Sequence, residues 1–378
     1  MNIVVAPDSF KGSLSAIEVG MIIKKAFTQE FKEANVKVIP MADGGEGTVD
    51  ALLYATDGQR IELIATNQAG KKIPAFYGVL GDCKTVVIEV AGIVGLTLIP
   101  EEVRNPIQYT TYGVGELILH ALDKGNRKFI IGLGGSATND GGMGMLHALG
   151  ARFLDQDQNV VSPIAASLSQ VRSVNYETLD PRIWEADIRA ACDVDNPLCG
   201  PNGASYVFGP QKGLTSMQIE ELDSGLSVYA DCIEEHLQQR HQNTAGAGAA
   251  GGLGFAFLTI GAKLESGAFI VARANNIGGS LACANWLITG EGKTDGQSLC
   301  GKLPVYMAKE AKKYNVPTIL LSGGLDNSLE SLFDYFDSMH AIANGPMSLE
   351  ASIEQAESLL FHKARNIARL LKNKTSIK

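Results

Sequence analysis

The fold class follows from residues 1–40, MNIVVAPDSFKGSLSAIEVGMIIKKAFTQEFKEANVKVIP. Residues 3–6 form a short apolar run typical of a buried strand, and residues 36–40 form a second one. Between them, residues 15–31 carry apolar side chains at helical spacing, which predicts an amphipathic helix. Two strands joined by a crossover helix make a βαβ unit, in which the strands run parallel and the connection is right-handed. We therefore expect an α/β fold.

The rest of the chain repeats this alternation at its end and departs from it in the middle. Short apolar strands alternate with amphipathic helices over residues 286–371. Residues 60–89 instead contain short β segments separated by glycine turns, which predicts antiparallel pairing. We expect two α/β domains: a discontinuous Rossmann-like or flavodoxin-like domain with a parallel sheet, from residues 1–75 and 275–378, and an inserted mixed α/β domain, from residues 76–274.

Three further elements are expected in the second half of the chain. Residues 286–289 read as a strand that ends before a glycine-rich stretch, and residues 349–371 read as one helix. Residues 244–262 carry no charge and reach the length of a membrane span, but their glycines and alanines lower the hydrophobicity per residue. We interpret this last segment as a packed helix of a soluble protein.

Composition limits the classes of function. Of 378 residues, 45% are apolar and 19% charged, which favours packed cores over disorder. The 32 Lys and Arg against 41 Asp and Glu give a net charge of -9, so we expect no nucleic-acid partner and no membrane partner. The six cysteines form no disulfide pattern, and the first apolar run is too short for a signal peptide, which predicts a cytoplasmic protein.

One glycine-rich pattern occurs twice. Residues 43–47 read DGGEG and residues 140–144 read DGGMG, each before a short apolar helical stretch. A helix N-terminus has unpaired N–H groups and a partial positive charge, and glycine lets an anion approach the backbone. Each loop could therefore bind a phosphate or a carboxylate. The alternative is that Asp43 and Asp140 cap helices and that the glycines serve turns.

The stretch before the second copy, residues 130–139, is a strand running into a polar glycine loop, and it allows a rival interpretation. Residues 132–137 (GLGGSA) fit the dinucleotide-binding fingerprint, and Asp155 lies about where a ribose-binding acid belongs. That fingerprint needs a helix from its second glycine, whereas residues 138–142 resist helix formation. The longer loop suits phosphates together with a metal ion.

A third glycine-rich stretch, residues 290–296, reads GEGKTDG. Its GKT copies the end of a P-loop, but the first glycine of that motif would fall on Leu287, so the loop is too short to wrap a phosphate. Glu291 and Asp295 remain, beside Lys293 at the carboxyl end of a parallel strand, where open α/β sheets bind ligands. A solvated turn with salt bridges is the alternative.

Acids and lysines also follow the other strands. The loop after residues 3–6 holds Asp8, which could bind Mg²⁺ or a substrate hydroxyl, and Lys11, which could meet a phosphate as a point charge. Asp193 and Asp195 follow a predicted strand and could act as bases or metal ligands. Lys212 lies in a turn, with a purely structural role as the alternative.

At these residues the chain resembles the glycerate kinase family, the bacterial type that makes 2-phosphoglycerate or 3-phosphoglycerate from D-glycerate and ATP. The resemblance runs almost end to end. It implies a two-domain α/β enzyme with its active site in the cleft between the domains. It rests on residues 6–13, 42–48, 134–142, 193–205, 208–213, 246–252 and 289–295.

Phosphoryl transfer requires positioning and neutralisation of charge, which glycine amides, acids that bind Mg²⁺ and one or two cations can supply. The expected cofactors are ATP and Mg²⁺. Catalytic candidates are Asp193, Lys11, Asp295 and Lys212, and the candidate metal ligands are Asp295 and Asp193. Candidates for binding glycerate are Asp8, Ser9, Asp43, Gly44, Gly45 and Glu46. Candidates for binding the ATP phosphates are Gly134, Gly135, Ser136, Asn139, Asp140, Gly290, Glu291, Gly292 and Lys293.

The residues alone leave two other classes of function open. An NAD(P)-dependent oxidoreductase acting on a small hydroxy acid would show a nucleotide absorbance change and no need for Mg²⁺. A non-catalytic sensor of small anions would be stabilised by its ligand without turnover. The sequence also leaves open which hydroxyl of glycerate is phosphorylated, which carboxylate is the base, and whether the chain forms a homo-oligomer.

Overall fold

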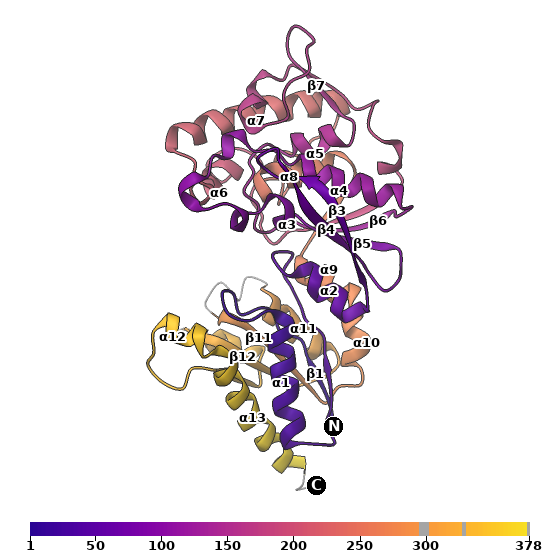
Figure 1. Cartoon of the computed structure of the whole chain (residues 1–378). Coiled ribbons are helices and arrows are strands. Elements are labelled where there is room, and N and C mark those ends of the chain that lie inside the picture. Colours follow the sequence, from indigo (N-terminus) through magenta and orange to yellow (C-terminus); the bar gives the residue numbers. More distant parts are fainter. Residues whose placement is uncertain (295–301, 327–329, 376–378) are drawn as a thin grey trace. The chain divides into compact units, whose positions relative to one another are not determined.

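The computed structural model describes residues 1–294, 302–326 and 330–375 (Figure 1). The chain divides into two compact units. Unit 1 comprises Met1–Asp43, Asp50–Asp57 and Ala268–Lys378, and unit 2 comprises Gly44–Val49 and Gly58–Gly267. Residues 58–75, which the sequence-based division places in the first domain, belong to unit 2, because they form strands of that unit's sheet.

Unit 1 is built on a parallel sheet, as expected from the βαβ pattern. The sheet has five strands in the order β13-β12-β11-β1-β2, and every neighbouring pair is parallel. Its strands are β1 (Asn2–Val5), β2 (Asn35–Val38), β11 (Trp286–Thr294), β12 (Thr318–Leu325) and β13 (Ser338–Ala341).

Helices cover the sheet of unit 1. Ser15 and Glu18 form a capping box at the start of α1 (Ala16–Glu30), which packs beside α13 (Ala356–Thr375) over one apolar core (Figure 1). The single helix expected over residues 349–371 is wrong. It is divided at Gln355 into α12 (Leu349–Glu354) and α13, and α12 buries no residue that would hold it in line with α13. The other helices are α2 (Thr48–Thr56), α9 (Gly267–Ala274), α10 (Ile277–Leu281), α11 (Leu303–Lys313) and the 3-10 turn η7 (Glu330–Asp334).

Unit 2 contains a mixed sheet of six strands in the order β10-β9-β6-β5-β4-β3. The expected antiparallel pairing is confirmed for β3, β4 and β5, whereas β5, β6, β9 and β10 pair in parallel. The strands are β3 (Gln59–Thr66), β4 (Lys72–Val79), β5 (Thr85–Glu89), β6 (Lys128–Gly132), β9 (Asp187–Ala191) and β10 (Lys263–Glu265), with β7 (Arg152–Leu154) and β8 (Ser173–Asn175) in a separate pair.

Helices and 3-10 turns complete unit 2. The helices are α3 (Ala91–Val94), α4 (Tyr112–Asp123), α5 (Met143–Ala148), α6 (Ala204–Lys212), α7 (Ser216–Leu237) and α8 (Ala249–Thr259). The 3-10 turns are η1 (Leu96–Leu98), η2 (Glu101–Val103), η3 (Pro106–Gln108), η4 (Ala165–Gln170) and η5 (Pro181–Ile183). The largest apolar core of the described residues lies among these elements and the six-stranded sheet.

The glycine- and alanine-rich segment is only partly the helix that its sequence predicts. Within α8, residues 250–252 have positive φ angles, so the chain turns there and becomes regular helix only afterwards. Gly251 is required at the turn, because a Cβ on it would lie 2.0 Å from the carbonyl oxygen of Thr138. Across the described residues, no helix combines the length and the apolar character that crossing a bilayer requires.

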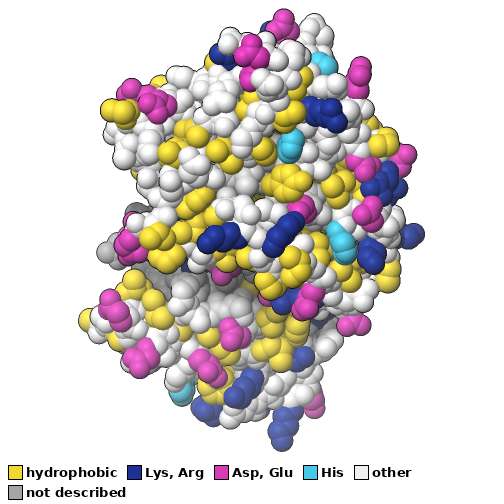
Figure 2. All heavy atoms as spheres, turned by 45° about the horizontal axis from the view of Figure 1, so that its top comes forward, with side chains coloured by type: hydrophobic (Ala, Val, Ile, Leu, Met, Phe, Trp, Pro, Cys, Tyr) yellow, Lys and Arg dark blue, Asp and Glu magenta, His cyan; other side chains and the backbone are white. Residues whose placement is uncertain are grey.

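The geometry of the dinucleotide-binding fingerprint is not found in unit 2. After β6 the chain stays in a loop until Met143, where α5 begins, rather than entering a helix at Gly134. The strand before Asp155 is β7, which pairs with β8 outside the six-stranded sheet and so is no neighbour of β6. These contacts give the oxidoreductase alternative no support. Figure 2 shows acidic and basic side chains interspersed on the face that it displays, without a large basic patch there.

Candidate active site

Unit 1 brings three of the predicted side chains together at the carboxyl ends of its strands. The chain after β1 continues beside β11, where the N–H of Asp8 donates to the carbonyl of Gly290 at 2.8 Å. The chain after β2 runs beside it, and the Lys11 ammonium lies 3.4 Å from Asp43 Oδ2. The Lys11 side chain is 79% exposed and that of Asp43 is 38% exposed, so solvent reaches this cluster. Parallel strands thus assemble an acid, a cation and a second acid, as the edge rule predicts.

The electrostatics of this cluster make Asp8 unusual. Burial, followed by the negative charge of Asp43, raises the pKa of Asp8 to about 7. The N–H of Ser9, which donates to Asp8 Oδ1 at 2.7 Å, and the charge of Lys11 oppose that shift. The charge of Asp43 is also the largest influence on Lys11 and raises the pKa of its ammonium. Asp8 is therefore a carboxyl group that exchanges a proton near neutral pH, next to a permanent cation.

The described part of the third glycine-rich stretch, residues 290–294, is not the loop that the sequence predicts. Gly290, Glu291, Gly292 and Lys293 lie in β11, which continues to Thr294 and pairs with β12 along this stretch. A Cβ on Gly290 would lie 2.1 Å from a carbonyl oxygen of the neighbouring strand, so close strand pairing explains this glycine.

The side chains of this stretch differ in their environments. Glu291 is 7% exposed and accepts a hydrogen bond from Thr294 Oγ1 at 2.9 Å, while Lys293 is exposed. Asp295, predicted as a catalytic residue and metal ligand, lies outside the described residues.

Unit 2 holds the other predicted group, in the loop between β6 and α5. Lys212, the last residue of α6, is 2% exposed. Its ammonium donates to the Thr138 carbonyl at 2.6 Å and to Ser136 Oγ at 3.3 Å. Asn139 is fully buried, and its amide donates to Ser205 Oγ at 2.8 Å. The structure thus groups Ser136, Asn139 and Lys212, and it places Lys212 at the end of a helix and within the protein rather than in a turn.

Asp140 has the capping role that was the alternative for it. Its carboxylate is fully buried and accepts four hydrogen bonds, from the N–H groups of Gly142 and Gly144 (both 3.1 Å) and from the N–H and hydroxyl of Thr111 (2.7 and 2.8 Å). Burial nevertheless raises the pKa of Asp140 above its ordinary value. Its carboxylate oxygens are engaged by the protein, so Asp140 shapes this loop and caps α5.

A different side chain caps the helix after the first copy of the motif. Glu89, at the end of β5, accepts hydrogen bonds at Oε2 from the N–H groups of Gly47 (3.1 Å) and Val49 (3.3 Å). In both copies a carboxylate of the protein therefore occupies the helix N-terminus. The hypothesis that these N-terminal N–H groups bind a ligand's phosphate or carboxylate is wrong for Gly47, Val49, Gly142 and Gly144.

The glycines of the two motifs also have a packing role. The N–H of Gly134 donates to the carbonyl of Gly44 at 3.1 Å, and a Cβ on Gly134 would lie 2.7 Å from the Cα of Gly45. Two backbones can approach this closely only without side chains. Gly135 is exposed and Glu46 is exposed, so each remains able to contact a ligand.

Asp193 follows β9 as predicted, and its side chain is exposed. It accepts a hydrogen bond from the N–H of Gly267 at 3.0 Å. No cluster of three or more His, Cys, Asp or Glu side chains suited to a metal occurs among the described residues. A magnesium ion does not require such a cluster, because it usually keeps several waters and takes one or two carboxylates together with substrate phosphates.

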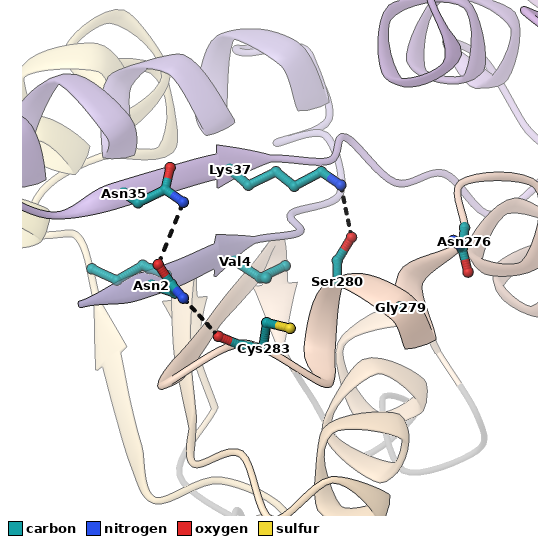
Figure 3. Close-up of a pocket in the computed structure, with 9 residues that line it drawn as sticks. Asn2, Val4, Asn35, Lys37, Asn276, Gly279, Ser280 and Cys283 are labelled. Carbon is teal, nitrogen blue, oxygen red and sulfur yellow. Dashed lines mark hydrogen bonds between the residues drawn. The ribbon is translucent and has the colours of Figure 1, made fainter.

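A cavity of about 330 Å³ lies elsewhere in unit 1 (Figure 3). It is lined by Asn2 and Asn35 from the amino ends of β1 and β2, and by Lys37, whose ammonium donates to Ser280 Oγ at 2.9 Å. Because Asp8 follows the carboxyl end of β1, this cavity and the Asp8–Lys11–Asp43 cluster lie at opposite ends of the same strand.

Comparison with known protein families and structures shows the family to which this chain belongs. The model of the glycerate kinase family matches residues 3–372. The chain belongs to the glycerate kinase family. It is therefore an enzyme and a kinase, and this family implies ATP as the phosphate donor.

Glycerate kinases with similar sequences and structure support the assignment. The glycerate kinase of Bacillus subtilis (strain 168) is 45% identical over 374 residues, 98% of each chain. The glycerate 2-kinase of Escherichia coli (strain K12) is 44% identical over 373 residues, again 98% of each chain. A solved structure from Salmonella typhimurium LT2, described as glycerate kinase 2, superposes with a TM-score of 0.90 at 42% identity, covering 100% of this chain and 99% of that one.

Three residues of this enzyme have roles in the site that the sequence did not predict. Glu89 accepts a hydrogen bond at the N-terminus of α2, and Thr111 donates to the Asp140 carboxylate. The carbonyl of Thr138 accepts a hydrogen bond from the Lys212 ammonium. Glu89 could have been noticed as an acid at a strand end, in the same way as Asp8. Thr111 and Thr138 carry no comparable local signal, because their partners lie 29 and 74 residues away.

Proposed function

We propose that this enzyme transfers the γ-phosphoryl group of ATP to the 2-hydroxyl of D-glycerate, giving 2-phosphoglycerate and ADP. The bond between the glycerate oxygen and phosphorus forms, the bond between the γ-phosphorus and the β–γ bridging oxygen breaks, and the hydroxyl proton goes to a base. The observation that carries the proposal is the Asp8–Lys11–Asp43 cluster of unit 1. The name of the Escherichia coli relative, a glycerate 2-kinase, supports the choice of hydroxyl.

Asp8 is suited to be that base. A general base works best when its pKa lies near the working pH, and the pKa of Asp8 is raised to about 7. Asp8 is therefore the first candidate for the base, ahead of Asp193. Lys11 presents an exposed ammonium beside Asp8, where it can bind the carboxylate of glycerate or the transferred group as a point charge. Asp43 holds this ammonium in place.

The loop of residues 134–139 is proposed to hold the phosphates of ATP. The N–H groups of Ser136, Thr138 and Asn139 find no acceptor among the described residues, unlike those at the starts of α2 and α5. Backbone N–H groups of this kind stabilise the charge of phosphoryl oxygens. Asp140 supports the loop without touching the nucleotide.

Mg²⁺ would neutralise charge on the ATP phosphates when bound. Asp193 is the described residue proposed to bind it, because an exposed carboxylate supplies the hard oxygen ligand that Mg²⁺ prefers. Asp295 stays a predicted second ligand. The location of the active site in an inter-domain cleft stays a prediction.

Turnover and product identity test the proposal. The enzyme should release ADP from MgATP only when D-glycerate is present, and chelation of Mg²⁺ should abolish this activity. Phosphorus NMR of the product should show 2-phosphoglycerate. A product phosphorylated at the 3-hydroxyl would contradict the regiochemistry alone, whereas the absence of ADP release with D-glycerate would overturn the function.

A further inference from the structure

Lys212 is a buried cation whose surroundings are incomplete. Its side chain is 2% exposed, and no carboxylate of the described residues lies within ion-pair distance of its ammonium. An ammonium has three N–H donors, and the two described acceptors, the Thr138 carbonyl and Ser136 Oγ, leave one donor unused. A buried charge without a partner is unfavourable, so the site favours either loss of the proton or arrival of an anion.

The loop that Lys212 contacts has further unsatisfied groups. Thr138 Oγ1 and Asn139 Oδ1 are buried, and neither has a partner among the described residues. The N–H groups of Ser136, Thr138 and Asn139 are likewise without described acceptors. Buried polar groups are almost always hydrogen-bonded in proteins, so the unpaired N–H groups and the Thr138 hydroxyl beside the ammonium indicate a site for an acceptor-rich ligand. Asn139 Oδ1 is an acceptor and is not part of this set of donors. A phosphate group offers several acceptor oxygens and negative charge.

The charged and titratable groups around Lys212 do not neutralise it. Burial lowers the pKa of Lys212 to about 7, and the negative charge of Asp140 opposes this shift only in part. Tyr229 of α7 is buried near the same carboxylate, and its pKa is raised well above its ordinary value, so it stays neutral. Arg104 donates to the carbonyl of Gln211, next to Lys212 in the chain, and adds positive rather than negative charge.

We propose that Lys212 and residues 135–139 form one phosphate subsite, in which the bound phosphate of the nucleotide makes Lys212 take up a proton. This inference rests on the proposed function only in naming the nucleotide. Free enzyme above neutral pH holds Lys212 largely as the neutral amine. A phosphate beside it favours the ammonium, and the proton comes from the buffer. Nucleotide affinity therefore falls as the pH rises above neutrality.

Calorimetric titration of the whole enzyme with ADP and excess Mg²⁺ tests this coupling. The titration is run at about pH 8 in several buffers that differ in ionisation enthalpy. The slope of the apparent binding enthalpy against the ionisation enthalpy of the buffer gives the number of protons taken up. The wild type should take up close to one proton per ADP. Lys212→Arg, which keeps a charge at every accessible pH, should bind ADP with no uptake. Lys212→Met should bind ADP at least ten-fold more weakly, also with no uptake. Lys37→Met, in the exposed cavity of unit 1, is the matched control and should behave as the wild type.

The possible results separate the proton-uptake inference from the proposed kinase function. Tight ADP binding by the wild type without proton uptake would overturn the inference and leave the proposed kinase function standing. Uptake that persists in Lys212→Arg would also overturn it, because another group would then be the acceptor. If Lys212→Met does not fold, the wild type and Lys212→Arg still decide. Failure of ADP to bind the wild type would overturn the inference together with the nucleotide site.

Discussion

The two copies of the D-G-G-x-G motif have nearly the same sequence and opposite environments. Asp43 in the first copy is 38% exposed and pairs with the exposed Lys11. Asp140 in the second copy is fully buried and accepts four hydrogen bonds that cap α5. In the first copy the capping role belongs to Glu89. The comparison teaches that this motif specifies a turn before a helix, while the partners of its acid specify what the acid does.

The same contrast extends to the lysines. Lys11 lies beside acids in solvent, so the pKa of its ammonium is raised, mainly by Asp43. Lys212 lies in the interior, where burial lowers its pKa to about 7. One lysine is therefore a permanent cation at physiological pH, and the other changes charge there. Seven variants test whether the two copies differ in this way.

The largest expected effect is on catalysis at Asp8, whose pKa is raised in part by Asp43 of the first copy. Asp8→Asn should lower kcat/KM by roughly 10²- to 10⁴-fold, because an amide cannot accept the hydroxyl proton. In the wild type, activity should fall as the pH decreases through about 7, since protonation of Asp8 removes the base. A pH–rate profile measures both effects. Near wild-type turnover in Asp8→Asn would exclude Asp8 as the base.

In the second copy, loss of the aspartate should lower the stability of the protein. Asp140→Ala should reduce the free energy of unfolding by about 2–5 kcal/mol, because it leaves buried N–H groups of Thr111, Gly142 and Gly144 without an acceptor. Urea denaturation measures the loss. Asp43→Ala serves as the control and should change stability by less than about 1 kcal/mol, as expected for an exposed ion pair. Equal losses in both variants would contradict the contrast between the copies.

Glu89 should show a smaller effect as the cap of α2. Glu89→Ala is expected to lower the free energy of unfolding by about 1 kcal/mol, the usual contribution of a lost N-cap. Glu89→Gln keeps an acceptor oxygen and should recover part of this loss. A larger loss in Glu89→Gln than in Glu89→Ala would show that the capping bonds are not what Glu89 contributes.

The smallest effect is a shift in the pH dependence. The charge of Asp43 is the second cause, after burial, of the raised pKa of Asp8. In Asp43→Asn the acidic limb of the pH–rate profile should therefore move to lower pH, while the maximal rate changes less than in Asp8→Asn. The profile should move in the opposite direction in Lys11→Met, because the charge of Lys11 lowers the pKa of Asp8. An acidic limb that is unchanged in both variants would assign it to another group.

Local patterns predicted much of this molecule. The apolar run at β1 and the helical spacing of α1 appear where the sequence places them, and the parallel sheet of unit 1 follows from them. The acid and lysine after β1 could be singled out because the carboxyl ends of parallel strands meet at one edge. The extension of β11 through Gly290 and Gly292 could not, since glycine favours loops and only pairing with β12 makes it a strand here.

The alternation of strands and helices, the turns that need glycine, and the acids and lysines at strand ends can all be read from the sequence. These depend on neighbours within a few residues, which set backbone propensity and periodicity. Which acid caps which helix, and which lysine is buried, depends on the folded chain. Glu89 contacts Gly47 across 42 residues and Lys212 contacts Thr138 across 74, and burial and charge depend on such distant partners rather than on the residues beside them.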